Sequence, residues 1–148
     1  MAIAVRESVW LFPAIETLHL FGLIAVVGST VLLDVRLLGL GPRRQRVSRL
    51  AERTLPWTWT GFAIMVVTGF LLFSSGAGRY YENAPFRFKL LMIVVAGLNA
   101  LVFQLGAYRR VGAWDANTAT PMGAKVAGAA SLLLWCGIVL AGRWIAYF

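Results

Sequence analysis

Three ionisable side chains occur within one strongly apolar stretch near the start of the chain. The motif "ETLH" contains Glu16 and His19, and Asp34 follows in "LLDVRLLG". In a helix, at about 100° per residue, Glu16 and Asp34 fall on one stripe and His19 lies about 60° to its side. An ionisable group inside a membrane costs a few kcal/mol unless it is paired. These residues therefore indicate a functional site.

The composition of this stretch favours some cofactors over others. Glu-x-x-His is the helix motif of di-iron bundles, but those sites need two copies and further glutamates. A zinc protease needs H-E-x-x-H and a third ligand, whereas the chain has one histidine. Haem needs only one imidazole on iron, an apolar slot and cations for its propionates. Copper, bound by imidazole, thioether and carboxylate, is the alternative.

Counting residues from the helix ends places further polar groups near the depth of His19. Lys89 and Arg143 lie within about a turn of the same surface, where they would hold propionates or an anionic substrate. Met92 is a candidate sixth haem ligand, alongside an empty position or His19 of a second protomer. Asn99 lies about 15 Å beyond Lys89, as a second-layer residue or as a bond to a neighbouring helix.

Two other interpretations of the same residues stay open. Glu16 would orient His19 or relay protons in a haem site, but it could instead pair with Arg143 or Lys89. His19 would then bridge two helices, and the polar groups would form a buried clasp in a non-catalytic accessory subunit. Alternatively, Glu16 and Asp34 at the two ends of one stripe suggest a transport or metal-handling protein.

The composition predicts an integral membrane protein. The 148 residues are 59% hydrophobic and 14% charged, whereas soluble domains carry about 25% charged residues. Four apolar stretches each reach the roughly 20 residues that a membrane helix needs, and the first is too long for a signal peptide. We expect one all-α transmembrane domain, residues 1–148, that forms a four-helix bundle. The predicted helices cover residues 10–38, 55–75, 86–108 and 124–148.

The positions of the cations predict the orientation of this bundle. A net charge of +8 would suggest nucleic acid in a soluble protein, but nine of the 14 Lys and Arg residues fall on one side of the membrane. The positive-inside rule then puts both chain ends outside and the basic loops in the cytoplasm of a bacterial inner membrane. Nucleic acid is not needed as a partner. The nine are Arg36, Arg43, Arg44, Arg46, Arg49, Arg53, Arg109, Arg110 and Lys125.

The basic loop, residues 39–54, precedes the second predicted helix. Val47 and Leu50 share a face there, which fits a short helix on anionic lipid headgroups as well as a simple orienting loop. Pro56 is expected to open the next helix, in which Gly61, Thr68 and Gly69 suit close helix contact. The single cysteine, Cys136, excludes an intramolecular disulfide and is expected to serve packing.

Several motifs resemble a known group of small bacterial membrane proteins. "LLDVRLLG" and "FRFKLLMIVVAGLNALVF", with the histidine of the first helix, resemble the CopD and HemJ group. "IETLHLFGL" and the terminal "GRWIAY" resemble more closely a four-helix family, DUF6644. HemJ-type proteins are haem-b-containing protoporphyrinogen oxidases, whose first-helix histidine and third-helix lysine would match His19 and Lys89. CopD-type proteins are associated with copper uptake.

The resemblance does not extend to all the features that protoporphyrinogen oxidase activity or copper uptake needs. HemJ-type proteins have further histidines that this chain lacks, and CopD-type proteins have more helices and a periplasmic copper-binding domain. Shared with both are the bundle and a first-helix histidine near a third-helix lysine. We therefore expect a homo-oligomeric haem b protein that handles electrons near the outer leaflet with a redox partner. Whether it catalyses a reaction is left open.

Overall fold

The computed structural model of the chain describes residues 8–41, 45–115 and 119–147. Within these residues the fold is all-α, as predicted, and four long helices are apolar enough to cross a membrane. The shortest of them has 22 residues, or about 33 Å, against a hydrocarbon layer of about 30 Å. The chain is therefore a multi-pass membrane protein. The long helices are α2 (Leu11–Leu37), α3 (Val47–Ser75), α5 (Ala84–Leu105) and α7 (Met122–Trp144).

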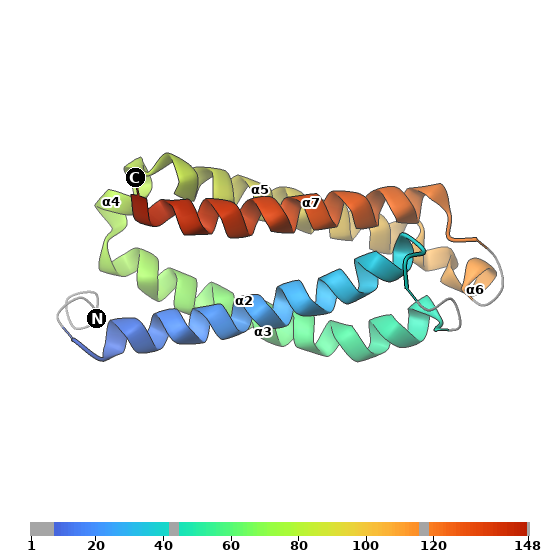
Figure 1. Cartoon of the computed structure of the whole chain (residues 1–148), viewed down its shortest axis with the longest axis horizontal. Helices are drawn as coiled ribbons and strands as arrows, with labels where there is room; N and C mark the ends of the chain where they lie inside the picture. Colours follow the sequence, from blue (N-terminus) through green and yellow to red (C-terminus); the bar gives the residue numbers. More distant parts are fainter. Residues whose placement is uncertain (1–7, 42–44, 116–118, 148) are drawn as a thin grey trace.

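In the described part of the chain, four short helices join or end the long ones: α4 (Ala77–Glu82), η1 (Tyr108–Arg110), α6 (Val111–Trp114) and η2 (Ile145–Tyr147). The start of α2 and the end of α7 lie at the same end of the bundle as α4, and α6 lies at the other end (Figure 1). Predictions that concern Arg43, Arg44 and Phe148 lie outside the described residues.

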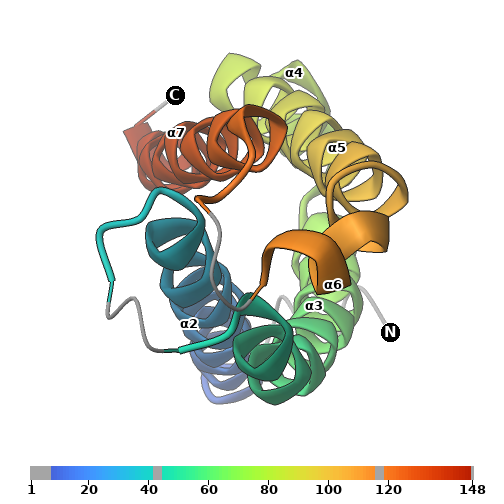
Figure 2. The ribbon, with the colours of Figure 1, turned by 90° about the vertical axis from the view of Figure 1, so that its right-hand side faces the viewer.

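The four long helices form a ring when viewed along the bundle (Figure 2). Helix α2 packs against α3 and α7, and α5 packs against α7, whereas α3 and α5 make little contact in the part of the chain described. Large apolar side chains such as Phe21, Phe70 and Leu133 are more than half exposed on the outside of the ring. Such a surface suits lipid.

Helices α2 and α3 approach each other through two glycines. A Cβ atom added to Gly61 would lie 2.7 Å from the carbonyl oxygen of Gly22, closer than any side chain permits. Membrane helices gain most of their association energy from such tight packing, because lipid gives apolar side chains no reason to leave it. The glycine pair thus fixes the rotation of α3 against α2.

Helix α3 begins at Val47, earlier than the predicted start at residue 55, and Pro56 lies inside it. The reason is tertiary packing, because Val47 is fully buried in a cluster with Leu37, Trp114 and Ala124. This burial outweighs the one backbone hydrogen bond that an interior proline removes. The second half of the predicted basic loop is therefore the first turns of α3.

Asp115, which is distant in sequence, caps the start of α3. Its carboxylate accepts hydrogen bonds from the Ser48 backbone N–H, at 3.1 Å, and from the Ser48 hydroxyl. Burial alone would raise the pKa of Asp115, but hydrogen bonds from Ser48 and Val47 and the charge of Arg46 outweigh it and lower that pKa. The carboxylate satisfies N–H groups that a helix start leaves open.

At the opposite end, Asn83 joins α5 to the end of α7. Its side chain accepts from the Phe86 N–H at 3.0 Å and donates to the Ile145 carbonyl at 3.1 Å. Phe86 in turn stacks on Phe73 of α3, with ring centroids 5.6 Å apart. Both ends of the bundle are therefore held by specific polar contacts, and stacked aromatic rings join α3 to α5 at this end.

We predict that Asp115→Ala frays the first turn of α3, at a cost of about 1 kcal/mol, the usual value of a lost helix cap. Amide hydrogen exchange in residues 47–50 should accelerate, and the thermal midpoint in detergent should fall. Asp115→Asn, which keeps an acceptor oxygen, is the matched control and should lose less. Unchanged exchange in Asp115→Ala would contradict the capping role.

The same contact predicts a pH dependence. Because the pKa of Asp115 is lowered in the folded protein, its stabilisation is complete above the ordinary carboxyl pKa and is lost as the pH falls through the lowered value. The exchange protection of residues 47–50 should therefore fall in acid. In Asp115→Asn this part of the acid sensitivity should be missing, and an identical pH profile in both proteins would refute it.

Candidate functional site

His19 lies on α2 with its imidazole directed at α3. Its Nδ1 is 2.8 Å from Oγ1 of Thr68, a hydroxyl that is almost fully buried, with 2% of the residue exposed. A Cβ added to Gly69 would lie 3.3 Å from Cε1 of His19, so this glycine leaves room for the ring. Thr68 and Gly69, which the sequence indicates only as packing residues, are thus the immediate neighbours of the imidazole.

The Thr68 hydroxyl determines which imidazole nitrogen carries the proton. A threonine hydroxyl has one hydrogen, and Thr68 donates it to the Ile64 carbonyl at 2.6 Å. The hydroxyl oxygen can therefore only accept from His19, so Nδ1 must be the N–H nitrogen. In a neutral imidazole, Nε2 then keeps its lone pair. Ligand histidines in metal sites are arranged in this way, with the second nitrogen donating to a fixed partner.

Lys89 is the predicted site residue that the structure brings toward His19. It lies on α5, half-buried, within electrostatic range of the imidazole. A Cβ added to Gly142 of α7 would lie 3.5 Å from the Lys89 Nζ, so the ammonium group lies beside α7. The cation and the imidazole therefore share the end of the bundle that also holds α4.

The other predicted site residues do not contact the imidazole of His19 in the hydrogen bonds and contacts of the described residues. Glu16 is exposed on α2, and the Arg143 guanidinium, also exposed, lies over the Tyr147 ring at 5.4 Å. Met92 packs against α7, where its sulfur would be 2.7 Å from a Cβ at position 137. Asn99 donates to the Ala127 carbonyl at 2.9 Å, the interhelical bond expected of a buried amide. None of these contacts forms a clasp between Glu16 and Arg143.

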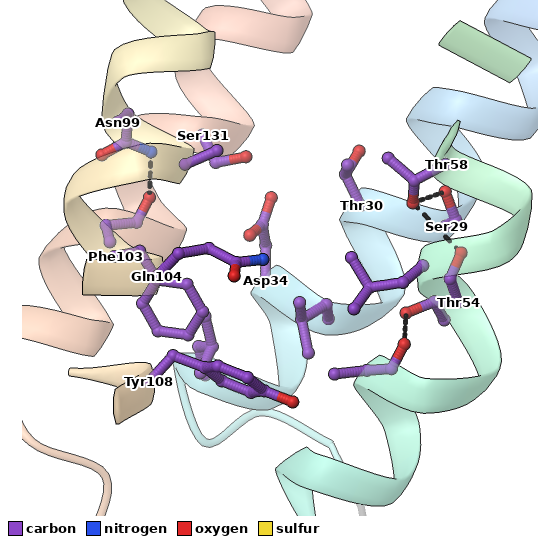
Figure 3. A pocket seen from close by; sticks show the side chains of 16 residues that line it. Ser29, Thr30, Asp34, Thr54, Thr58, Asn99, Phe103, Gln104, Tyr108 and Ser131 are labelled. Carbon is purple, nitrogen blue, oxygen red and sulfur yellow. Dashed lines mark hydrogen bonds between the residues drawn. The ribbon is translucent and has the colours of Figure 1, made fainter. Parts of the chain in front are cut away.

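A second polar site lies toward the opposite end of the bundle, between α2, α3, α5 and α7 (Figure 3). It is a cavity of about 110 Å³. Asp34, with 6% of the residue exposed, lines it, and its Oδ2 is buried without a hydrogen-bond partner among the described residues. Ser131 of α7 and Thr30 of α2 flank the carboxylate (Figure 3). The other polar residues lining the cavity are Ser29, Thr54, Thr58, Asn99, Gln104 and Tyr108.

The sequence indicates Asp34 as a costly residue but gives no sign of this cavity. Its serine and threonine hydroxyls come from three helices, and no spacing within one helix identifies them together. The only signal is that Ser and Thr recur on the helix faces that turn out to meet. Among the described residues, no cluster of three or more His, Cys, Asp or Glu side chains exists that would hold a metal ion without further partners.

Comparison with known proteins gives a family match. The model of a family of unknown function, DUF6644, matches residues 11–148, which includes all four long helices. No match is found among curated proteins or among solved structures.

The arrangement around His19 predicts one tautomer, Nδ1–H with a bare Nε2. Since the chain has a single histidine, protein labelled with ¹⁵N-histidine and carrying no affinity tag gives one pair of ring signals. In metal-free protein in detergent, at a pH where the ring is neutral, Nδ1 should show the shift of a protonated nitrogen.

Thr68→Val is the matched variant, because it keeps the branched shape and removes the acceptor. In this variant the imidazole should lose its preference for the Nδ1–H tautomer, so that the ¹⁵N shifts of the two ring nitrogens move toward a common average. A protonated Nε2 in the unmodified chain would contradict the assignment.

Proposed function

Because the chain belongs to the DUF6644 family, whose description assigns no activity, we propose its function from its own side chains: it binds haem b through His19. The observation that carries this proposal is the Nδ1–H···Thr68 bond. It holds the ring, fixes the tautomer and leaves Nε2 free to ligate iron. When bound, the haem would supply a one-electron iron couple.

The surroundings of His19 supply the other requirements of the group. Lys89, within electrostatic range, provides a cation for a propionate, and Arg143, exposed near the end of α7, can provide a second. Gly69 leaves room for the imidazole ring at its Cε1 atom. The limited contact between α3 and α5 gives a flat ring a side from which to approach. The Asp34 cavity, at about 110 Å³, is too small for haem.

The candidate site residues have separate roles in this proposal. Thr68 orients the imidazole and makes Nε2 a stronger ligand for iron. Lys89 balances the charge of a propionate. Glu16 is an exposed carboxylate one helical turn from His19, and it can exchange protons with water. Met92, seated beside Gly137, is a sixth-ligand candidate only if it leaves that contact. Asn99 belongs instead to the Asp34 cavity.

The setting of the proposal follows the charge distribution. With the basic ends of α3 and α7 in the cytoplasm of a bacterial inner membrane and in contact with anionic lipids, His19 lies in the outer half of the bilayer. The exposed apolar side chains of the ring suit either lipid or further copies of the chain. We infer electron transfer with an external redox partner in a homo-oligomer.

The proposal predicts a pigmented protein. Chain expressed with an adequate haem supply and purified in detergent should show a Soret band and, after dithionite, the α and β bands of a b-type haem. His19→Ala should lose the haem, measured per chain as the pyridine haemochrome. A colourless wild-type protein, or equal haem content in His19→Ala, would rule the assignment out.

Two matched variants separate ligation from packing. Thr68→Val should keep haem but shift its reduction potential, because the imidazole loses its hydrogen-bond partner. Glu16→Gln, an exposed change on the same helix, should leave haem content unchanged. If His19→Ala fails to fold, as shown by its circular dichroism, the potential of Thr68→Val carries the test.

A further inference from the structure

We propose that the cavity at Asp34 binds a small monovalent cation, of the class of Na⁺. The proposal does not depend on the haem assignment, since it uses neither His19 nor Lys89. Its starting point is a buried carboxylate oxygen, Asp34 Oδ2, that lines a cavity and has no hydrogen-bond partner among the described residues. An uncompensated charge at this depth is costly, and a bound cation removes the cost.

Two threonine hydroxyls at the cavity present oxygen lone pairs rather than protons, whereas the Ser131 hydroxyl of α7 lies close enough to Asp34 to donate to it. Thr30 donates its one hydrogen to the Val26 carbonyl at 2.8 Å, and Thr54 donates its own to the Leu50 carbonyl at 2.9 Å. A hydroxyl whose hydrogen is used on its own helix can only accept from, or coordinate, what enters the cavity. These hydroxyls therefore cannot stabilise Asp34 by donating to it.

Ser29 and Thr58 add to the same pattern. Their hydroxyls are 2.6 Å apart, and they also bond the Val26 and Thr54 carbonyls at 3.0 and 3.1 Å. Two hydrogens serve three contacts, so neither is left for the cavity whichever hydroxyl is the donor. This wall of the cavity is thus a set of oxygen acceptors, the ligand type that hard cations prefer.

Charge and size together select the ion. Asp34 is the only carboxylate among the described residues lining the cavity, and none of them is Lys or Arg. One negative charge neutralises a monovalent ion, whereas a divalent ion would leave a net charge buried in a poorly polarisable site. A volume of about 110 Å³ accommodates an ion with a few waters, since one water needs about 10–15 Å³ in the same measure.

The test is a binding measurement on the full chain in detergent, with ²²Na⁺ as the probe and choline chloride holding the ionic strength constant. The wild-type protein should bind Na⁺ saturably, one ion per chain. Asp34→Asn keeps the shape and removes the charge, and it should lower the affinity about ten- to a hundredfold, the effect of losing one charged contact. Absence of saturable binding, or equal affinity in Asp34→Asn, would overturn the proposal.

Two further variants keep the test decisive. Thr30→Val retains the branched side chain and removes one oxygen, so its affinity should be several-fold lower even if Asp34→Asn fails to fold. Unchanged affinity in a folded Thr30→Val would count as disproof in that case. Glu52→Gln, an exposed carboxylate outside the cavity on α3, is the matched control and should bind as the wild type does.

A proton is the competing occupant of the same carboxylate. Among the described residues that line the cavity, Tyr108 is the only titratable group besides Asp34, because α3, α5 and α7 contribute hydroxyl, amide and apolar side chains. Acid should therefore weaken Na⁺ binding by protonating Asp34, and Tyr108→Phe should retain this effect. A thermal midpoint that responds to pH through Asp34 but not to Na⁺ would show a proton site alone and would refute the cation site.

Discussion

Polar groups carried into a bilayer must find their partners inside the protein, because the hydrocarbon offers none. In this bundle the threonines of α3 meet that requirement for α2: Thr68 accepts from His19, and Thr58 bonds Ser29. The close approach of Gly22 and Gly61 between these two levels sets the rotation that makes both contacts possible. The chemistry of the bundle thus depends on how α3 is packed against α2.

The packing of α3 against α2 produces a different polar site at each end of the bundle. At His19 the accepting hydroxyl leaves one nitrogen lone pair open beside a lysine, which suits a metal-centred group and its anionic substituents. At Asp34 the hydroxyls of Thr30 and Thr54 use their hydrogens on their own helices, and the carboxylate oxygen Oδ2 has no donor among the described residues. One end therefore offers an imidazole nitrogen, which suits transition metals such as iron, and the other a set of hard oxygen ligands.

Hydropathy and helix length were sufficient to predict the all-α fold and the four spans, because both depend on local composition. Counting residues from the helix ends also predicts that Lys89 lies at a depth close to that of His19. It could not give helix rotation, so it missed that Arg143 turns to Tyr147 and that Thr68, not Glu16, contacts the imidazole. The start of α3 at Val47 and the Asp34 cavity depend on contacts between distant segments, which no single-helix pattern contains.

The central claim is that Nε2 of His19 is bound to haem iron, and pulsed electron paramagnetic resonance tests it most directly. Protein labelled with ¹⁵N-histidine carries the label at one residue only. The account predicts that the ferric haem of the labelled protein shows a ¹⁵N hyperfine coupling where the unlabelled protein shows ¹⁴N. Identical spectra from the two samples, or the absence of a haem signal, would contradict it.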